Sequence, residues 1–473
     1  MDFRRTTVVA LAAAVRSGEV SARELTTHAL ERIEALDPSV NAFVAVDGDR
    51  ALDQAAAVDQ IVATGGNPGP LAGVPLAVKD NEDAAGYPTT MGSALFAGGA
   101  PAVHDSPHVA RLRAAGSVVV GKTNLSELAW SAHTTNARFG TTANPWALDR
   151  SAGGSSGGSA AALAAGMVPL ATGSDDGGSI RIPSACCGLS GMKPSLGRVP
   201  AGEAEGAGRL DLSSKGPMAR RIADVAAALD VAVGPEPTDL RSLPRPEANW
   251  RDAVEAPRLP ARVAWSPTLG YAEVDAEVLA VCERALSTIE SLGAEVVDPG
   301  PVLDRDPIGD WLTLIGACLL HTVEPHRHRP EWEEMDPVLA GIVESARSTS
   351  AADLLGVFDR CHEMNLRLVE VFRRTRLLVT PTTAGPAPPA ALSGSGTVNG
   401  EVTPNWVRFT YPFNLTRSPA ATVCAGLTPS GVPVGLQLVG PQHADLVVLR
   451  AAAALEEAIG FDLVAGSDPG PGG

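Results

Sequence analysis

Two clusters rich in glycine and serine constrain this chain more than any other feature. They lie in residues 153–181, GGSSGGSAAALAAGMVPLATGSDDGGSIR, with Ser155 in the first cluster and Ser179 in the second. Glycine lets backbone approach a ligand closely and tolerates positive φ. A serine in such a turn presents its hydroxyl beside free backbone N–H groups, as a nucleophile with an oxyanion hole requires. The alternative is a flexible linker, which the apolar, helix-forming stretch between the clusters disfavours.

The composition is that of a globular protein long enough to bury a sizeable core. The chain has 473 residues, 45% of them hydrophobic, and a formal net charge of −17. This acidic balance argues against nucleic acid or an anionic membrane as a direct partner, and no apolar run reaches the ~18 residues of a membrane span. We interpret the N-terminal segment as two helices, the second opened by a capping box at residues 21–24, rather than as a signal peptide. We therefore expect a cytoplasmic protein.

Cysteine and histidine usage predicts neither disulfides nor a metal site. No Cys-x-x-Cys pair occurs among the six cysteines, and most of them lie in apolar segments, so we expect buried free thiols. His326 and His328 flank an arginine in a polar run, but no further cluster of ligands lies nearby. We expect no metal and no cofactor.

Lysine is rare in this chain and confined to the region that holds the Gly-Ser clusters. The lysines are Lys79, Lys122, Lys193 and Lys215, among 37 basic residues. Unlike arginine, lysine can lose its proton when it is desolvated. Lys79 follows the apolar run 71–78, which predicts a buried strand, so its pKa should fall and it could act as a general base. An ordinary strand-end lysine paired with Asp80 fits the sequence equally well.

Three short motifs match known patterns in their letters but not in their context. Residues 116–123 match a phosphate loop, but the residues between the glycines predict a strand and those before them a helix. Residues 190–193 match the S-x-x-K of penicillin-binding enzymes without its partner motifs. Residues 153–157 match the G-x-S-x-G elbow without a buried strand leading into it. We base no function on these three matches.

Taken together, Lys79 and residues 153–181 resemble the amidase signature family. The other matching segments are residues 71–80, 121–127, 144–146, 187–188, 192–194, 197–199, 411–415 and 431–437, so that the resemblance spans about residues 5–460. It implies one α/β/α domain, residues 1–466, on a mixed, mostly parallel twisted sheet, followed by a flexible tail, residues 467–473. The alternation of strand-like apolar runs with helix-like stretches agrees with this α/β class.

The resemblance also implies a Ser-Ser-Lys triad. Ser179 would be the nucleophile, Ser155 the bridging serine after a cis peptide bond, and Lys79 the base. The N–H groups that would form the oxyanion hole belong to Asp176, Gly177, Gly178 and Ser179. The residues that would support the triad are Ser156, Asp175 and Arg181.

The sequence departs from the family pattern at three places outside the triad. Asp176 stands where the family usually carries an uncharged threonine or isoleucine, Arg417 where glycine is common, and Cys424 where proline is frequent. An acid beside an oxyanion hole would repel the developing negative charge unless its side chain points away. The orientation of Asp176 therefore matters for the reaction.

These features predict an amidase that hydrolyses carbon–nitrogen bonds of small linear amides, with aryl amides, esters and carbamates (a urethanase activity) within reach of the same chemistry. The alternatives are the glutaminase subunit of a tRNA-dependent amidotransferase and a non-catalytic binding member of the family. The expected partner is a small-molecule substrate, without direct contact to nucleic acid or membrane, and a homodimer is left open. The candidates for an apolar or aromatic substrate pocket are Met91, Trp130, Trp311 and Trp406.

Overall fold

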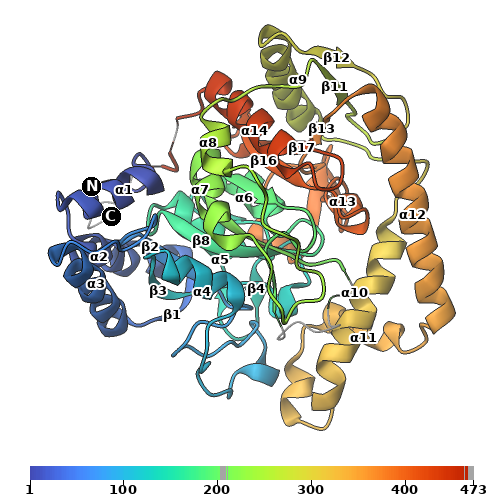
Figure 1. Cartoon of the computed structure of the whole chain (residues 1–473). Helices are drawn as coiled ribbons and strands as arrows, with labels where there is room; N and C mark the ends of the chain where they lie inside the picture. The colour runs from blue at the N-terminus through green and yellow to red at the C-terminus, as the bar shows by residue number, and fades with distance from the viewer. Residues whose placement is uncertain (203–208, 210, 463, 467–473) are drawn as a thin grey trace.

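An 11-stranded sheet runs through the computed structural model, which describes residues 1–202, 209, 211–462 and 464–466 (Figure 1). Its strands follow the order β1-β3-β2-β8-β10-β9-β16-β17-β13-β11-β12. Their bounds are β1 (Phe43–Val46), β2 (Pro75–Lys79), β3 (Val118–Thr123), β8 (Leu170–Asp175), β9 (Ser190–Lys193), β10 (Ser214–Ala219), β11 (Arg262–Trp265), β12 (Glu295–Val297), β13 (Leu378–Pro381), β16 (Ala420–Leu427) and β17 (Pro433–Val439).

The sheet is mixed, as predicted, and its strand directions change along its width. β2 runs parallel to both β3 and β8, and β11 runs parallel to both β12 and β13. Antiparallel pairings through β10, β9, β16 and β17 join these two parallel groups, and β1 adds an antiparallel edge. The parallel strands β2 and β8 are buried along their whole length, as is usual where helices cover both faces of a sheet.

Helices lie on both faces of the sheet. In the view of Figure 1, α7 and α14 lie in front of the sheet, whereas α5 and α6 pack against β8 and β9 from behind. The helices are α1 (Val8–Ser17), α2 (Ala22–Val40), α3 (Gly48–Ala63), α4 (Pro107–Ala114), α5 (Gly157–Ala164), α6 (Arg181–Cys187), α7 (Ile222–Ala232), α8 (Trp250–Val254), α9 (Ala276–Ser291), α10 (Ile308–Val323), α11 (Pro337–Ala346), α12 (Ala351–Arg374), α13 (Pro412–Leu415) and α14 (Asp445–Ile459).

Short elements complete the structure outside the main sheet. The remaining strands are β4 (Thr135–Asn136), β5 (Gly140–Thr141), β6 (Ala143–Asn144), β7 (Ala147–Ser151), β14 (Gly396–Val398) and β15 (Glu401–Thr403). The 3-10 helices are η1 (Ala94–Phe96), η2 (Glu127–Ala129), η3 (Glu324–His326), η4 (Pro330–Glu334) and η5 (Ala390–Leu392).

The local predictions for the capping box, the phosphate-loop look-alike and the cysteines are confirmed. The capping box that opens α2 is present, with Ser21 and Glu24 each bonded to the other's backbone N–H. The phosphate-loop look-alike forms the strand β3 after helix α4. The six cysteines are all buried, and within the described residues they form no disulfide. Within the described residues, no helix is both long and apolar enough to cross a membrane.

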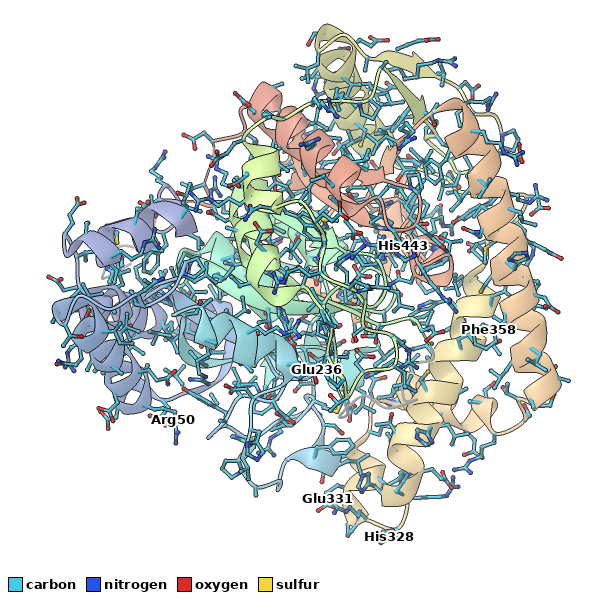
Figure 2. All side chains as sticks on the ribbon, in the orientation of Figure 1. Arg50, Glu236, His328, Glu331, Phe358 and His443 are labelled. Carbon is cyan, nitrogen blue, oxygen red and sulfur yellow. The ribbon has the colours of Figure 1, made fainter. Side chains whose placement is uncertain are left out.

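The buried apolar side chains form one contiguous cluster that extends from Phe3 to Leu455. The division into one domain and a flexible tail stays a prediction, because the proposed tail, residues 467–473, lies outside the described residues. His328 lies at the outer edge of the molecule near Glu331, before helix α11 (Figure 2). The described residues contain no group of three or more side chains suited to hold a metal ion.

Candidate active site

Lys79 ends the buried strand β2 and directs its amine at two serine hydroxyls. Lys79 Nζ lies 2.8 Å from Ser155 Oγ and 2.9 Å from Ser174 Oγ, and the side chain is fully buried. The backbone N–H of Lys79 donates to Thr172 Oγ1 on the neighbouring strand β8 at 3.0 Å. Strand pairing thus fixes the lysine beside both Gly-Ser clusters.

The structure excludes the interpretation of Lys79 as a strand-end lysine paired with Asp80. Asp80 forms its ion pair with Lys122, whose Nζ lies 3.0 Å from Asp80 Oδ1, and both side chains are buried. Asp80 also accepts hydrogen bonds from the N–H and the hydroxyl of Thr90. Lys79 is therefore not the strand-end partner of Asp80, and its hydrogen bonds go to uncharged hydroxyls.

Burial lowers the pKa of Lys79 from its ordinary value to about 7. Desolvation is the largest cause, because the charged ammonium loses its hydration inside the protein. Among the neighbouring charges, Asp176 opposes this effect and raises the pKa, whereas Lys215 lowers it further. An amine with a pKa near neutrality is well suited to exchange protons at neutral pH.

The two Gly-Ser clusters lie side by side around Lys79. The peptide bond between Gly154 and Ser155 is cis, as predicted. Ser156 links the clusters, because its N–H donates to Ser179 O at 3.3 Å and its hydroxyl donates to Ser174 O at 3.3 Å. Ser179 lies in the turn between β8 and α6, where its side chain is 9% exposed whereas Ser155 is fully buried. Ser179 is thus the more accessible of the two serines.

A buried ion pair holds the turn that carries Ser179. Arg181 Nε and Nη2 donate to the two carboxylate oxygens of Asp175 at 2.9 and 2.8 Å. Asn414 Nδ2 donates to Asp175 Oδ1 at 2.9 Å, and Arg181 Nη1 donates to Gln437 Oε1 at 2.6 Å. Burial alone would raise the pKa of Asp175, but the attraction of Arg181 and the hydrogen bonds from Arg181 and Asn414 lower it to about 2, so the pair stays charged.

The predicted oxyanion-hole residues differ in how their N–H groups are used. Gly178, with φ of +132°, donates its N–H to Asp175 Oδ1 at 2.7 Å, and a Cβ at this position would clash with Thr410. Within the part of the chain that the structure describes, the N–H groups of Asp176, Gly177 and Ser179 donate no hydrogen bond. Three of the four predicted donors are therefore available to a developing oxyanion.

The Asp176 carboxylate is directed at Arg209. Arg209 Nη1 lies 3.5 Å from Asp176 Oδ2, and both side chains are largely buried. Trp311, at the start of α10, donates its indole N–H to the backbone oxygen of Asp176 at 2.8 Å. Its ring also lies against Gly177, where an added Cβ would come within 2.8 Å of the indole. These contacts fix the position of the turn from the α10 side.

The four predicted pocket residues fall into two groups. Met91 lines a cavity of about 230 Å³ together with Asn81, and Trp311 contacts Asp176 and Gly177 in the turn before Ser179. Trp406 is fully buried, packs edge-on against His133 at 5.8 Å and makes no hydrogen bond to the site among the described residues. Trp130 is half-buried at the end of η2. Of the four, the structure therefore places Trp311 against the turn that carries Ser179 and Met91 in the cavity wall with Asn81.

Other residues of the site were not singled out from the sequence. Ser174 accepts hydrogen bonds from Lys79 and from Asn81 Nδ2, the latter at 2.9 Å. Side chains alternate between the two faces of a strand, so Ser174 lies on the same face of the sheet as Thr172. This alternation could have identified Ser174 from the sequence. Arg209 and Asp176 belong to separate segments of the sequence. No local sequence pattern therefore predicted that they pair.

Comparison with curated proteins finds relatives that match over nearly the whole chain. The family profile described as Amidase matches residues 24–449. An acylamidase from Rhodococcus erythropolis is 37% identical over 455 residues, which cover 94% of each protein. A glutamyl-tRNA(Gln) amidotransferase subunit from Salinispora arenicola is 38% identical over 492 residues, which cover 97% of this chain and 98% of that protein.

Solved structures share the same architecture. A bacterial aryl acylamidase of the amidase signature family matches with a TM-score of 0.90 and 30% identity, covering 96% of both chains. A 6-aminohexanoate cyclic dimer hydrolase, solved with its substrate, matches with a TM-score of 0.87 and 28% identity, covering 98% of both chains. Both matches therefore extend over nearly the whole length of the fold.

Proposed function

Because this chain belongs to the amidase signature family, we propose that it hydrolyses small amides through a serine acyl-enzyme. Its family and its likeness to an acylamidase support a hydrolase of carbon–nitrogen bonds. The observation that carries the proposal is the 2.8 Å contact between Lys79 Nζ and Ser155 Oγ beside the glycine turn of Ser179. Linear amides, aryl amides, carbamates and esters all present the acyl carbon that such a site attacks.

In the proposed reaction, two serines relay one proton to the lysine. Neutral Lys79 takes the hydroxyl proton of Ser155, which takes that of Ser179, and Ser179 Oγ bonds to the substrate carbonyl carbon. The N–H groups of Asp176, Gly177 and Ser179 stabilise the oxyanion. The relay then runs in reverse, so the proton reaches the leaving nitrogen as the carbon–nitrogen bond breaks. Water hydrolyses the acyl-enzyme by the same steps.

The proposal predicts turnover in a panel of p-nitroanilides, aryl carbamates and simple amides. Release of p-nitroaniline, phenol or ammonia would be followed in purified protein, and at least one class should be hydrolysed. A panel without any turnover would contradict the proposal.

The likeness to the amidotransferase of Salinispora arenicola supports a second candidate function, the glutaminase part of a tRNA-dependent amidotransferase. Such a protein would release ammonia from glutamine and would co-purify with a partner. Hydrolysis of the panel by the isolated chain, without glutaminase activity, would favour the small-amide amidase.

The pH dependence of kcat/KM should report the ionisation of Lys79. The neutral amine is the proposed active form and its pKa is about 7, so we expect kcat/KM to rise with pH, to be half-maximal near pH 7 and to level off about one to two pH units above it. Activity that stays constant from pH 5 to 9, with the protein folded throughout, would contradict the role of Lys79 as base.

A variant of Asp176 tests the electrostatic part of this prediction. The carboxylate of Asp176 raises the pKa of Lys79, so Asp176→Asn should move the acid limb of the pH profile to lower pH. The exposed Asp304, which pairs with Arg367 on the surface, provides the matched control, and Asp304→Asn should leave the limb in place. A limb that stays in place or moves to higher pH in Asp176→Asn would contradict the prediction.

A further inference from the structure

Each carbonyl oxygen of residues 175–178, which lead to Ser179, accepts a hydrogen bond. The donors, acceptors and distances are Asn414 Nδ2 to Asp175 O (2.8 Å), Trp311 Nε1 to Asp176 O (2.8 Å), Thr410 Oγ1 to Gly177 O (2.6 Å) and Ile182 N–H to Gly178 O (2.7 Å). Donors from α6, α10 and the segment around α13 thus fix the peptide groups of this turn.

A carbonyl that is held in this way also fixes the N–H of the next residue. In a planar trans peptide bond, the C=O of one residue and the N–H of the next point in opposite directions. Among the described residues the only cis peptide bond joins Gly154 and Ser155, so the bond between Asp176 and Gly177 is trans. Because Trp311 holds the oxygen of Asp176, it directs the N–H of Gly177 away from α10.

The N–H of Gly177 is available to a ligand. Within the described part of the chain it donates no hydrogen bond, and Gly177 is partly exposed, whereas Gly178 is buried. The N–H of Gly178, by contrast, already donates to Asp175 Oδ1 at 2.7 Å. Trp311 therefore holds a peptide group whose N–H is free to donate, whereas Thr410 holds the next one, whose N–H is already used.

Trp311 is itself firmly held in the first turn of α10. Its ring packs against that of Tyr411, with ring centroids 6.2 Å apart and an angle of 32° between the planes. The hydroxyl of Tyr411 donates to Asp306 Oδ1 at 2.5 Å, and Asn405 Nδ2 donates to Asp306 Oδ2 at 2.8 Å, just before the helix begins. A donor that is held by its own neighbours can keep a carbonyl in one orientation.

We propose that Trp311 is a positioning residue of the oxyanion hole, whose indole N–H orients the peptide group between Asp176 and Gly177 so that the N–H of Gly177 is aimed at the oxyanion. This inference rests on the proposed function. A donor that is already oriented stabilises the developing charge without reorganisation during the reaction. Formation and hydrolysis of the acyl-enzyme both develop an oxyanion, so losing this orientation should slow both steps together.

The first test removes the indole N–H. Trp311→Phe keeps an aromatic ring but has no donor, and we expect kcat to fall by about 10- to 100-fold, whereas KM stays within about twofold, because one donor is misdirected rather than lost. The substrate is p-nitroacetanilide or another member of the panel that the wild type hydrolyses. Benzothienylalanine at position 311, which replaces only the N–H by sulfur, should give the same loss. It also decides the test should Trp311→Phe fail to fold, as judged by its melting temperature.

The second test measures stabilisation of the oxyanion directly. Ser179 Oγ adds to the carbonyl carbon of trifluoroacetophenone, whose oxygen then carries the negative charge, while the serine proton passes through the relay to Lys79. The alcohol formed by reduction of this ketone has a similar shape but cannot form the adduct. Trp311→Phe should weaken inhibition by the ketone by about tenfold or more and inhibition by the alcohol by less than about twofold. A residue that only lined the substrate pocket would affect both inhibitors alike.

Two further variants serve as controls. Thr410→Val removes the hydrogen bond to the next carbonyl of the turn, but Asp175 still holds the N–H of that peptide group, so inhibition by the ketone should weaken less than in Trp311→Phe. Trp332 is partly buried in η4, where it contacts Arg327. Trp332→Phe removes an indole N–H elsewhere in the protein and should keep the wild-type values.

Each outcome decides the proposal. An unchanged kcat in the Trp311→Phe and benzothienylalanine proteins, equal weakening of ketone and alcohol, or a loss in Thr410→Val as large as in Trp311→Phe would overturn it. A wild type that binds the ketone no more tightly than the alcohol would overturn it as well. Such results with a wild type that hydrolyses the panel would refute only this inference, whereas a wild type without any turnover would refute the proposed function.

Discussion

Replacing Ser179 with alanine is expected to lower kcat by about 10⁴-fold or more, because no acyl-enzyme can form without the nucleophile. Phosphonylation should disappear as well, since a fluorophosphonate reacts with the activated serine. Mass spectrometry of the labelled wild-type protein should place the label on Ser179. The measurement needs only intact-mass and peptide analysis of both proteins.

Two controls make the Ser179 experiment decisive. Ser430 is exposed in the turn between β16 and β17, and Ser430→Ala should keep wild-type activity and labelling. Ser155→Ala should lose most activity, because the relay to Lys79 is interrupted while the nucleophile remains. A label on Ser155 or any residue other than Ser179, or a Ser179→Ala variant that keeps more than about a hundredth of kcat, would refute the assignment.

Replacing Lys79 is expected to have the second-largest effect. Lys79→Met removes the base and should lower kcat by about 10²–10⁴-fold, the usual range for general-base catalysis. Lys79→Arg should not restore activity, because a guanidinium stays protonated at every accessible pH. Steady-state kinetics of both variants across the pH range would measure these losses, and the limb near pH 7 should vanish from any residual activity.

Lys193 provides a matched control for Lys79. It is also fully buried, burial lowers its pKa to about 7, and its Nζ donates to Pro194 O at 3.0 Å. Lys193→Met should therefore change the melting temperature more than the pH profile of the folded enzyme. Activity retained in Lys79→Arg, or an acid limb lost in Lys193→Met rather than in Lys79→Met, would mean that Lys79 is not the base.

The sequence predicted those parts of the site that local patterns encode. The apolar run before Lys79 predicted a buried strand, and the Gly-Ser segment predicted tight turns around Ser155 and Ser179. The resemblance to the amidase signature family predicted that Lys79, Ser155 and Ser179 act together. The structure adds the distance of 2.8 Å between Lys79 Nζ and Ser155 Oγ. These features depend on short stretches of chain, so one sequence was enough to identify them.

Features that depend on pairing between distant segments were beyond the sequence. The sequence could not show that Asp80 pairs with Lys122, because the two residues meet only when β3 is in place. Nor could the sequence show that the Asp176 side chain is directed at Arg209. The sequence could not distinguish a tryptophan that lines a pocket from one that is buried in the core, such as Trp406. Both kinds of tryptophan have similar neighbours in the sequence.

The hydrogen bonds of Arg181 tie the Ser179 turn to residues that are synthesised much later. Arg181 reaches Thr410 O and Gln437 Oε1, which lie 229 and 256 residues further along the chain. A ribosome will have made both Gly-Ser clusters, Lys79 and Asp175 long before these acceptors exist, so until then Arg181 can pair with Asp175 but not with Thr410 or Gln437. We therefore expect the turn of Ser179 to reach its final arrangement only after β17 has joined the sheet.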